Sequence, residues 1–110
     1  GNLAAIRDFT DARDVVRAYT LLMAKGISGK TYNVGGGTVC KISELLDRIL
    51  KLSTINIKVE IDNARLRPID TPEISADISE LKKDTGWSPT KTLDETLKET
   101  LDYWRKVLMI

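Results

Sequence analysis

The chain has 110 residues, of which 42% are hydrophobic and 30% charged, and 17 basic against 16 acidic residues leave a formal net charge of +1. This balance is ordinary for one globular domain with a modest core, and it excludes both the basic surface that nucleic acids require and an apolar span for a membrane. Because the sequence has no histidine, the commonest general base, the usual nucleophilic triads and most transition-metal sites are excluded as well.

The N-terminal part predicts a short extended segment followed by a helix. Residues 7–10 are the extended segment, and Asp11 has the side chain that suits a helix N-cap, with Asp14 favourable in the first turn. Apolar side chains then recur at helical spacing up to Gly26, which ends the helix. The apolar face consists of Val15, Val16, Tyr19, Leu22 and Met23.

The middle of the chain predicts a strand, a helix and a second strand. Residues 31–34 are expected to form a brief strand that three glycines stop, and Ser43 is expected to cap the next helix. The buried face of that helix is predicted to consist of Leu45, Leu46, Ile49 and Leu50. Residues 55–61 alternate between apolar and polar side chains, which is the clearest strand pattern in the chain. The apolar side of this strand consists of Ile55, Ile57, Val59 and Ile61.

The C-terminal part predicts one more extended segment and two helices. Residues 73–76 are expected to be extended, and Asp77 begins a capping-box pattern for a short helix at 78–85. Thr92 begins a second capping-box pattern ahead of the last helix. The apolar stripe of this last helix consists of Leu93, Leu97, Leu101, Trp104 and Leu108.

Short strands thus alternate with four helices, and this alternation predicts an α/β fold. The strands are few and short for a complete doubly wound sheet. The chain does not begin with Met, and its first residues have no start-of-protein character. We therefore expect either a small independent α/β domain or the tail end of a larger one.

The stretch from Arg65 to Pro72 carries the most suggestive chemistry. Arg65 and Arg67 lie two residues apart, and Pro68 pushes the residue before it towards an extended backbone, so both guanidinium groups should point the same way. A guanidinium fork suits the oxygens of a phosphate, and the carboxylate of Asp70 suits sugar hydroxyls. The pattern indicates a sugar nucleotide, with a surface linker of solvated charges as the alternative.

Other notable residues have structural explanations. Gly35-Gly36-Gly37 lacks the spacing of a phosphate-binding loop and is interpreted as a turn. Cys40 is interpreted as a buried or idle thiol, and a lone cysteine fits the reducing cytoplasm. Arg7 is either an ion-pair partner of Asp8 or a ligand-binding residue. No pair of side chains forms an acid–base or nucleophile constellation, so we expect a binding surface without a catalytic residue or a metal ligand.

Several segments together resemble extended short-chain dehydrogenases/reductases that act on nucleotide sugars, and the resemblance covers nearly the whole chain. The run from Gly1 to Tyr19, which contains Arg7-Asp8-Phe9, is similar to the start of their substrate-binding part. The other matching motifs are Tyr32-Asn33-Val34-Gly35-Gly36-Gly37 for Tyr-Asn-Val-Gly-Ser-Gly, Arg67-Pro68-Ile69-Asp70 for Arg-Pro-x-Asp, and Gly86-Trp87-Ser88-Pro89 for Gly-Trp-x-Pro. Within the family, the chain is most similar to GDP-mannose 4,6-dehydratases and GDP-4-keto-6-deoxy-mannose reductases.

The resemblance implies that residues 1–110 are a C-terminal sugar-nucleotide-binding domain of a Rossmann-type enzyme. Arg7 and Arg67 match arginines that grip the nucleotide diphosphate, Asp70 matches an aspartate that meets the ribose hydroxyls, and Asn2 is a further candidate. The family's glycine-rich nucleotide turn and its catalytic Tyr-x-x-x-Lys are absent from this sequence. The resemblance places them, with bound NADP(H) or NAD(H), on an N-terminal Rossmann half, so this segment should hold no cofactor and be inactive alone.

The parent enzyme is expected to be a GDP-sugar dehydratase, which is a lyase, or a GDP-sugar reductase, which is an oxidoreductase. One alternative is a fragment of a UDP-sugar 4-epimerase, and another is a stand-alone α/β interaction module without catalysis. A nucleotide sugar is the expected partner, with no nucleic acid and no membrane. We also expect an exposed apolar flank where a Rossmann half would pack, and homo-association through that flank.

Overall fold

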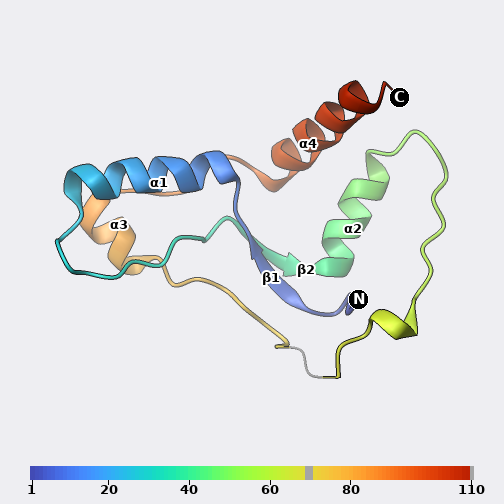
Figure 1. Ribbon diagram of the computed structural model, residues 1–110, viewed down its shortest axis with the longest axis horizontal. Coiled ribbons are helices and arrows are strands. Elements are labelled where there is room, and N and C mark those ends of the chain that lie inside the picture. Colours follow the sequence, from blue (N-terminus) through green and yellow to red (C-terminus); the bar gives the residue numbers. More distant parts are fainter. Residues whose placement is uncertain (69–70, 110) are drawn as a thin grey trace.

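A computed structural model describes residues 1–68 and 71–109 of the chain (Figure 1). Within them the elements are β1 (Ile6–Phe9), α1 (Ala12–Lys25), β2 (Thr38–Lys41), α2 (Ile42–Lys51), the 3-10 turn η1 (Asn63–Arg65), α3 (Ser79–Thr85) and α4 (Leu93–Leu108). Short strands with four α-helices in the described residues confirm the predicted α/β class. No helix in this part of the chain is long and apolar enough to cross a membrane.

Strand β1 is paired on both of its edges. On one edge, β2 runs antiparallel to it over its whole length. On the other edge, the N–H of Ile6 donates to the carbonyl oxygen of Pro72 at 2.8 Å, and the N–H of Ile74 donates to that of Ile6 at 3.0 Å. Ile6 also forms a parallel bridge with Glu73. The end of the arginine–proline stretch is therefore attached to the centre of the sheet.

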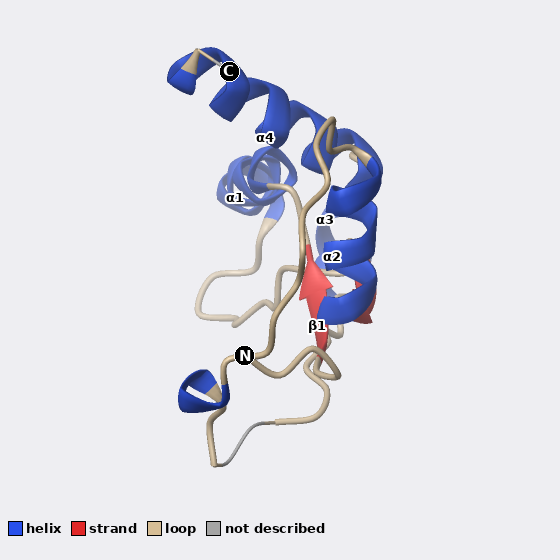
Figure 2. Ribbon diagram, turned by 90° about the vertical axis from the view of Figure 1, so that its right-hand side faces the viewer, coloured by secondary structure: helices blue, strands red, loops and turns tan. Residues whose placement is uncertain are grey.

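The core lies between α1 and α3, which lie close together at one end of the molecule (Figure 1) and behind α2 and α4 in the view of Figure 2. Ala18, Leu81 and Trp87 are fully buried there. Gly86 ends α3 in the left-handed conformation, with φ 72°, which turns the chain so that Trp87 packs back on the helix as predicted. Because this core is small, each of its members carries a large share of the stability.

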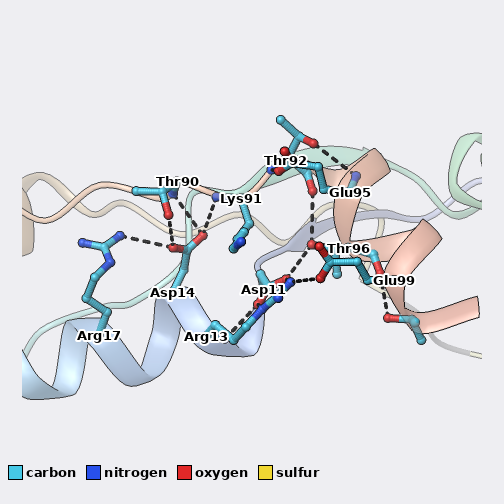
Figure 3. Close-up of polar contacts among 11 residues, drawn as sticks. Asp11, Arg13, Asp14, Arg17, Thr90, Lys91, Thr92, Glu95, Thr96 and Glu99 are labelled. Atoms are coloured by element: carbon cyan, nitrogen blue, oxygen red, sulfur yellow. Dashed lines mark hydrogen bonds and ion pairs between the residues drawn. The ribbon is translucent and has the colours of Figure 1, made fainter. Parts of the chain in front are cut away.

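Two aspartates at the start of α1, one at its N-cap and one in its first turn, attach the C-terminal segment to it (Figure 3). Asp11 caps α1 as predicted, since its carboxylate accepts the N–H of Arg13 at 2.8 Å. Hydrogen bonds from the guanidinium of Arg13, followed by the Thr96 hydroxyl at 2.6 Å, hold the pKa of Asp11 well below its usual range. The buried carboxylate of Asp14 accepts the N–H and the hydroxyl of Thr90, at 3.0 and 2.8 Å.

The strand predicted at residues 31–34 is wrong. These residues are irregular, and the strand that pairs with β1 is β2, which follows the three glycines. The hydroxyl of Tyr32 donates to Asp84 in α3 at 2.7 Å. Tyr32 and Val34 also pack against the core. This segment therefore uses its side chains to cover the core rather than its backbone to extend a sheet.

Two helix caps also differ from the prediction. Helix α2 begins directly after β2, so its N-cap is Lys41 and Ser43 already lies in the first turn. The N–H of Lys41 donates to the Glu44 carboxylate at 3.2 Å. The N-cap of α3 lies one residue after Asp77, whose carboxylate accepts the N–H of Ser79 at 2.9 Å. A side chain able to cap was present in each case, but the neighbouring backbone set the helix start elsewhere.

The strand predicted at 55–61 is not a strand in the structure, where these residues are exposed and irregular. The side chains expected to form the buried face of α2 are only half-buried. An alternating or helical pattern specifies which face an element can bury, but it does not supply the neighbour that covers that face.

The predicted exposed apolar flank is present on α1 and α4. Along α1 the buried residues are Asp14 and Ala18, and Leu22 packs against the core, whereas other members of the predicted apolar face are solvent-exposed, including Tyr19 and Met23. Helix α4 begins at its predicted cap, Thr92, and its apolar stripe is buried at the start and exposed towards the C-terminal end. Association of two copies through this flank stays a prediction.

Candidate functional site

An open cavity of about 490 Å³ lies where the N-terminal segment, the start of α2 and the stretch after η1 meet. Its lining consists of Gly1, Asn2, Leu3, Ala5, Ile42, Arg65 and Arg67. The first two N–H groups of α2 donate to the carbonyl oxygens of Ala5 and Leu3, both at 2.9 Å, and so hold the N-terminal segment against the helix. Because these helix N–H groups are occupied, an anion in the cavity would depend on the two guanidinium groups.

Two of the predicted site residues, Asn2 and Arg67, meet in this cavity although they are far apart in the sequence. Arg65 lines the same cavity, although it ends the 3-10 turn η1 and does not lie on the extended backbone that was expected for it. The Arg65 Nε lies 3.2 Å from an Asp62 carboxylate oxygen, and Asp62 also caps η1. Arg65 was part of the chemical argument but was not predicted as a site residue, and its place in the lining adds it to the candidates.

The remaining two predicted site residues are Arg7 and Asp70. Arg7 is on β1 opposite Cys40, and its guanidinium donates to the carbonyl oxygen of Ile6 at 2.7 Å. Arg7 is not among the described residues that line the cavity. Asp70 falls outside the described residues. Convergence of Arg7 and Arg67 on one diphosphate, and a ribose contact from Asp70, therefore stay predictions.

Asp8 joins the segments around the candidate site. Its carboxylate accepts the N–H of Gly36 at 2.8 Å, the N–H of Ala76 at 3.1 Å and the hydroxyl of Thr10 at 3.0 Å. Burial alone raises the pKa of Asp8, but these hydrogen bonds together outweigh it and lower the pKa. The sequence offered no signal for this role, since Gly36 and Ala76 are 28 and 68 residues away from Asp8. Asp8 thus ties β1 to the glycine turn and to the segment that continues from Arg67.

The three glycines form a turn, as interpreted from the sequence. Gly36 has φ 76°, and a Cβ at Gly37 would lie 2.2 Å from the carbonyl oxygen of Phe9. The N–H of Gly37 donates to the Thr10 hydroxyl at 3.2 Å, and that of Gly36 to Asp8. Because β1 and its flank occupy these N–H groups, this turn does not fit the phosphates of a dinucleotide cofactor.

Asp8→Asn is expected to destabilise the chain by about 1.5–3 kcal/mol, because hydrogen bonds to a charged group are worth that much and the amide retains only one acceptor oxygen. Urea unfolding followed by circular dichroism measures the change. Asp47→Asn, on the exposed side of α2, is the matched control and should change stability by less than about 0.5 kcal/mol. Equal stability of the two variants would contradict the linking role of Asp8.

Known proteins show the same arrangement of elements. The family model described as GDP-mannose 4,6 dehydratase matches residues 1–100. GDP-6-deoxy-D-mannose reductase of Pseudomonas aeruginosa is 32% identical over 104 residues, which cover 94% of this chain and 34% of that protein. The solved structure of RMD from Pseudomonas aeruginosa complexed with NADPH has a TM-score of 0.89 and 29% identity, and the match covers 97% of this chain and 35% of that one.

A relative whose solved structure contains a different nucleotide sugar is also similar to this chain. UDP-glucose 4-epimerase from Thermotoga maritima, solved with UDP-glucose, has a TM-score of 0.75 and 31% identity, covering 98% of this chain and 34% of its own. The chain thus spans about a third of the length of the relatives it matches. These findings confirm the resemblance that the motifs indicated. The chain belongs to the GDP-mannose 4,6 dehydratase family, within the extended short-chain dehydrogenases/reductases that act on nucleotide sugars.

Proposed function

We propose that this chain is the sugar-nucleotide-binding part of a GDP-mannose 4,6-dehydratase or a GDP-4-keto-6-deoxy-mannose reductase. The observation that carries the proposal is the cavity in which Asn2, Arg65 and Arg67 meet. The family match and the likeness to GDP-6-deoxy-D-mannose reductase support a GDP-linked sugar as the ligand.

The cavity has the chemistry that a nucleotide diphosphate requires. Guanidinium groups can bind phosphate oxygens through paired N–H groups, and each such charge-assisted hydrogen bond is worth roughly 1.5–3 kcal/mol. Arg65 and Arg67 supply these groups in the cavity, and Arg7 completes the set in our proposal. Asp70 would accept hydrogen bonds from the ribose hydroxyls, as a carboxylate suits a diol. The role of these residues is to hold and orient the substrate.

The hydride chemistry belongs elsewhere in the enzyme. In this proposal, NADP(H) or NAD(H) would supply it from a part of the enzyme outside this chain. The chain by itself would therefore bind substrate without converting it.

Arg67→Ala in the full-length enzyme should raise the KM for the sugar nucleotide by about 10- to 100-fold, because one charge-assisted bond to the diphosphate is lost. The KM for the dinucleotide should stay within about twofold, since that cofactor binds elsewhere in this proposal. Steady-state kinetics with each substrate varied in turn measures both. Arg48→Ala is the matched control, because Arg48 pairs with Asp94 on the surface and does not line the cavity. Equal increases in both KM values would refute the assigned role.

The alternative is a UDP-sugar 4-epimerase, which the likeness to the Thermotoga maritima enzyme favours. Isothermal titration of the full-length protein with GDP and with UDP separates the two. Tighter binding of GDP supports the proposal, and tighter binding of UDP supports the epimerase. Failure of both nucleotides to bind would favour an interaction module without catalysis.

A further inference from the structure

The chain exposes more surface than a self-contained domain of its length. Its accessible surface is 8251 Å², whereas a compact monomer of 110 residues exposes about 6,100 Å². Its radius of gyration is 16.9 Å, against about 13 Å for a compact domain of this length. The excess of about 2,000 Å² is more than the roughly 800 Å² that one partner contributes to a standard interface.

Residues 55–61 carry a distinct part of this surface, and we name them the open strand. Figure 1 shows them, in green to yellow, along the edge of the molecule between α2 and η1. The apolar side chains are exposed by 72% at Ile55, 48% at Ile57, 46% at Val59 and 71% at Ile61. Between them, Lys58 Nζ lies 2.8 Å from Glu60 Oε1, so the polar side chains at alternate positions share one side. One apolar and one charged side at a period of two is the side-chain pattern of a β-strand.

The open strand has the side-chain pattern of a β-strand, but its backbone has no neighbouring strand to pair with in the described chain. At its start, the N–H of Ile55 donates to the Ser53 hydroxyl at 3.2 Å. From residue 56 to residue 61, no backbone hydrogen bond to another part of the described chain occurs. An extended segment with free N–H and C=O groups and exposed β-branched side chains recruits a further strand.

We infer that the open strand pairs with a strand from the two thirds of the polypeptide that this chain does not span. Relatives about three times as long contain the necessary extra chain, and the excess surface is of the size that a permanent interface buries. This inference goes beyond the proposed function, because it holds whichever nucleotide binds. It also has a consequence for the cavity, since η1 and Arg65 follow the open strand directly and would be held in place by the pairing.

Amide hydrogen exchange tests the inference in two proteins. One is the 110-residue chain, and the other is a chimera in which this chain replaces the matching third of the Pseudomonas aeruginosa GDP-6-deoxy-D-mannose reductase. Amides 56–61 should exchange at nearly intrinsic rates in the chain and at least about 100-fold more slowly in the chimera. The interior amides of α1 are the internal control and should be protected in both.

A pair of substitutions tests the side-chain part of the inference. Ile57→Asp places a charge on the apolar side, whereas Lys58→Thr changes the polar side and is the matched control. Neither should change the melting temperature of the 110-residue chain by more than about 2 °C, because both side chains are largely exposed there. In the chimera, Ile57→Asp should lower the melting temperature by more than about 5 °C, while Lys58→Thr should not.

Four outcomes would overturn the inference. Fast exchange of amides 56–61 in a folded chimera is the first. Protection that rises with the concentration of the 110-residue chain would make a second copy the partner instead. An equal effect of Ile57→Asp on the melting temperature of both proteins would show that the longer protein does not cover the open strand. Should the chimera fail to fold, fast exchange at the aligned residues of the intact Pseudomonas aeruginosa reductase overturns it.

Discussion

Trp87→Ala is expected to remove most of the stability of this chain. Trp87 is fully buried against Ala18 and Leu81, and its indole N–H donates to the carbonyl oxygen of Asp14 at 2.9 Å. The substitution leaves a cavity and an unpaired buried carbonyl oxygen, which together cost about 3–5 kcal/mol. Small domains have only about 5–15 kcal/mol in total, and this core is small. A substantial unfolded population at room temperature is therefore the expected result.

Urea unfolding followed by circular dichroism measures this loss. Trp87→Phe retains a buried ring but no donor, and should cost about 1–2 kcal/mol for the missing hydrogen bond and the smaller ring. Trp104→Ala is the matched control, because Trp104 lies on α4 and is 51% exposed. Its expected cost is about 1 kcal/mol or less. A loss for Trp87→Ala no larger than that for Trp104→Ala would contradict the placement of the core.

Asp14→Asn is expected to cost about 2–3 kcal/mol at neutral pH and to flatten the dependence of stability on pH. The Asp14 carboxylate is 2% exposed and accepts the N–H of Lys91 at 2.9 Å in addition to the two bonds from Thr90. The guanidinium of Arg17 lies 3.2 Å from it (Figure 3). Bonds from backbone groups and a cation to a carboxylate are worth more than bonds to an amide, which explains the expected loss.

The sign of the pH effect follows from the pKa of this carboxyl group. Burial alone raises the pKa of Asp14, but the hydrogen bonds from Lys91, Thr90 and Arg17 outweigh it and lower the pKa in the folded state. The stabilisation is therefore present above the unfolded value of about 3.9 and is lost as the pH falls through the folded value. Asp11 acts in the same direction, since its pKa is also lowered.

Unfolding free energies measured from pH 7 down to pH 3 test this expectation. The native chain should lose stability steeply below about pH 4, whereas Asp14→Asn should start lower and change less. Asp94→Asn provides the control, because Asp94 is an exposed partner of Arg48 in a surface ion pair, which is worth little. Parallel curves for the native chain and Asp14→Asn would show that Asp14 does not supply the pH-dependent part of the unfolding free energy.

Local signals in the sequence predicted the helices well. Asp11 and Thr92 cap their helices as expected, and Gly86 closes α3 in the conformation that a residue without a Cβ adopts most easily. These features depend on groups within four residues of each other, so they can be read along the chain. The misplaced start of α2 shows the limit, because β2 runs directly into that helix and leaves Ser43 inside the first turn.

The sequence predicted the family, and the geometry of the candidate site only in part. The order of motifs pointed to an enzyme family that acts on nucleotide sugars, and the family match confirms that family. Asn2 and Arg67 share a cavity, but nothing local to either residue specifies that meeting. Arg65 entered the site through that cavity, and Asp8 emerged as a link between segments far apart in the sequence.

Residues close together in the sequence were enough to predict where α1 and α4 begin and where α1 and α3 end, because caps and turns act over a few residues. Which strands pair, and which apolar faces are covered, depends on contacts between segments that are far apart in the sequence. Residues 55–61 have the strongest strand pattern and no neighbour in the described chain, whereas β2 has a weaker pattern and pairs with β1. A strand is completed by hydrogen bonds to a distant segment, and a pattern of alternating side chains contains no information about where that segment lies.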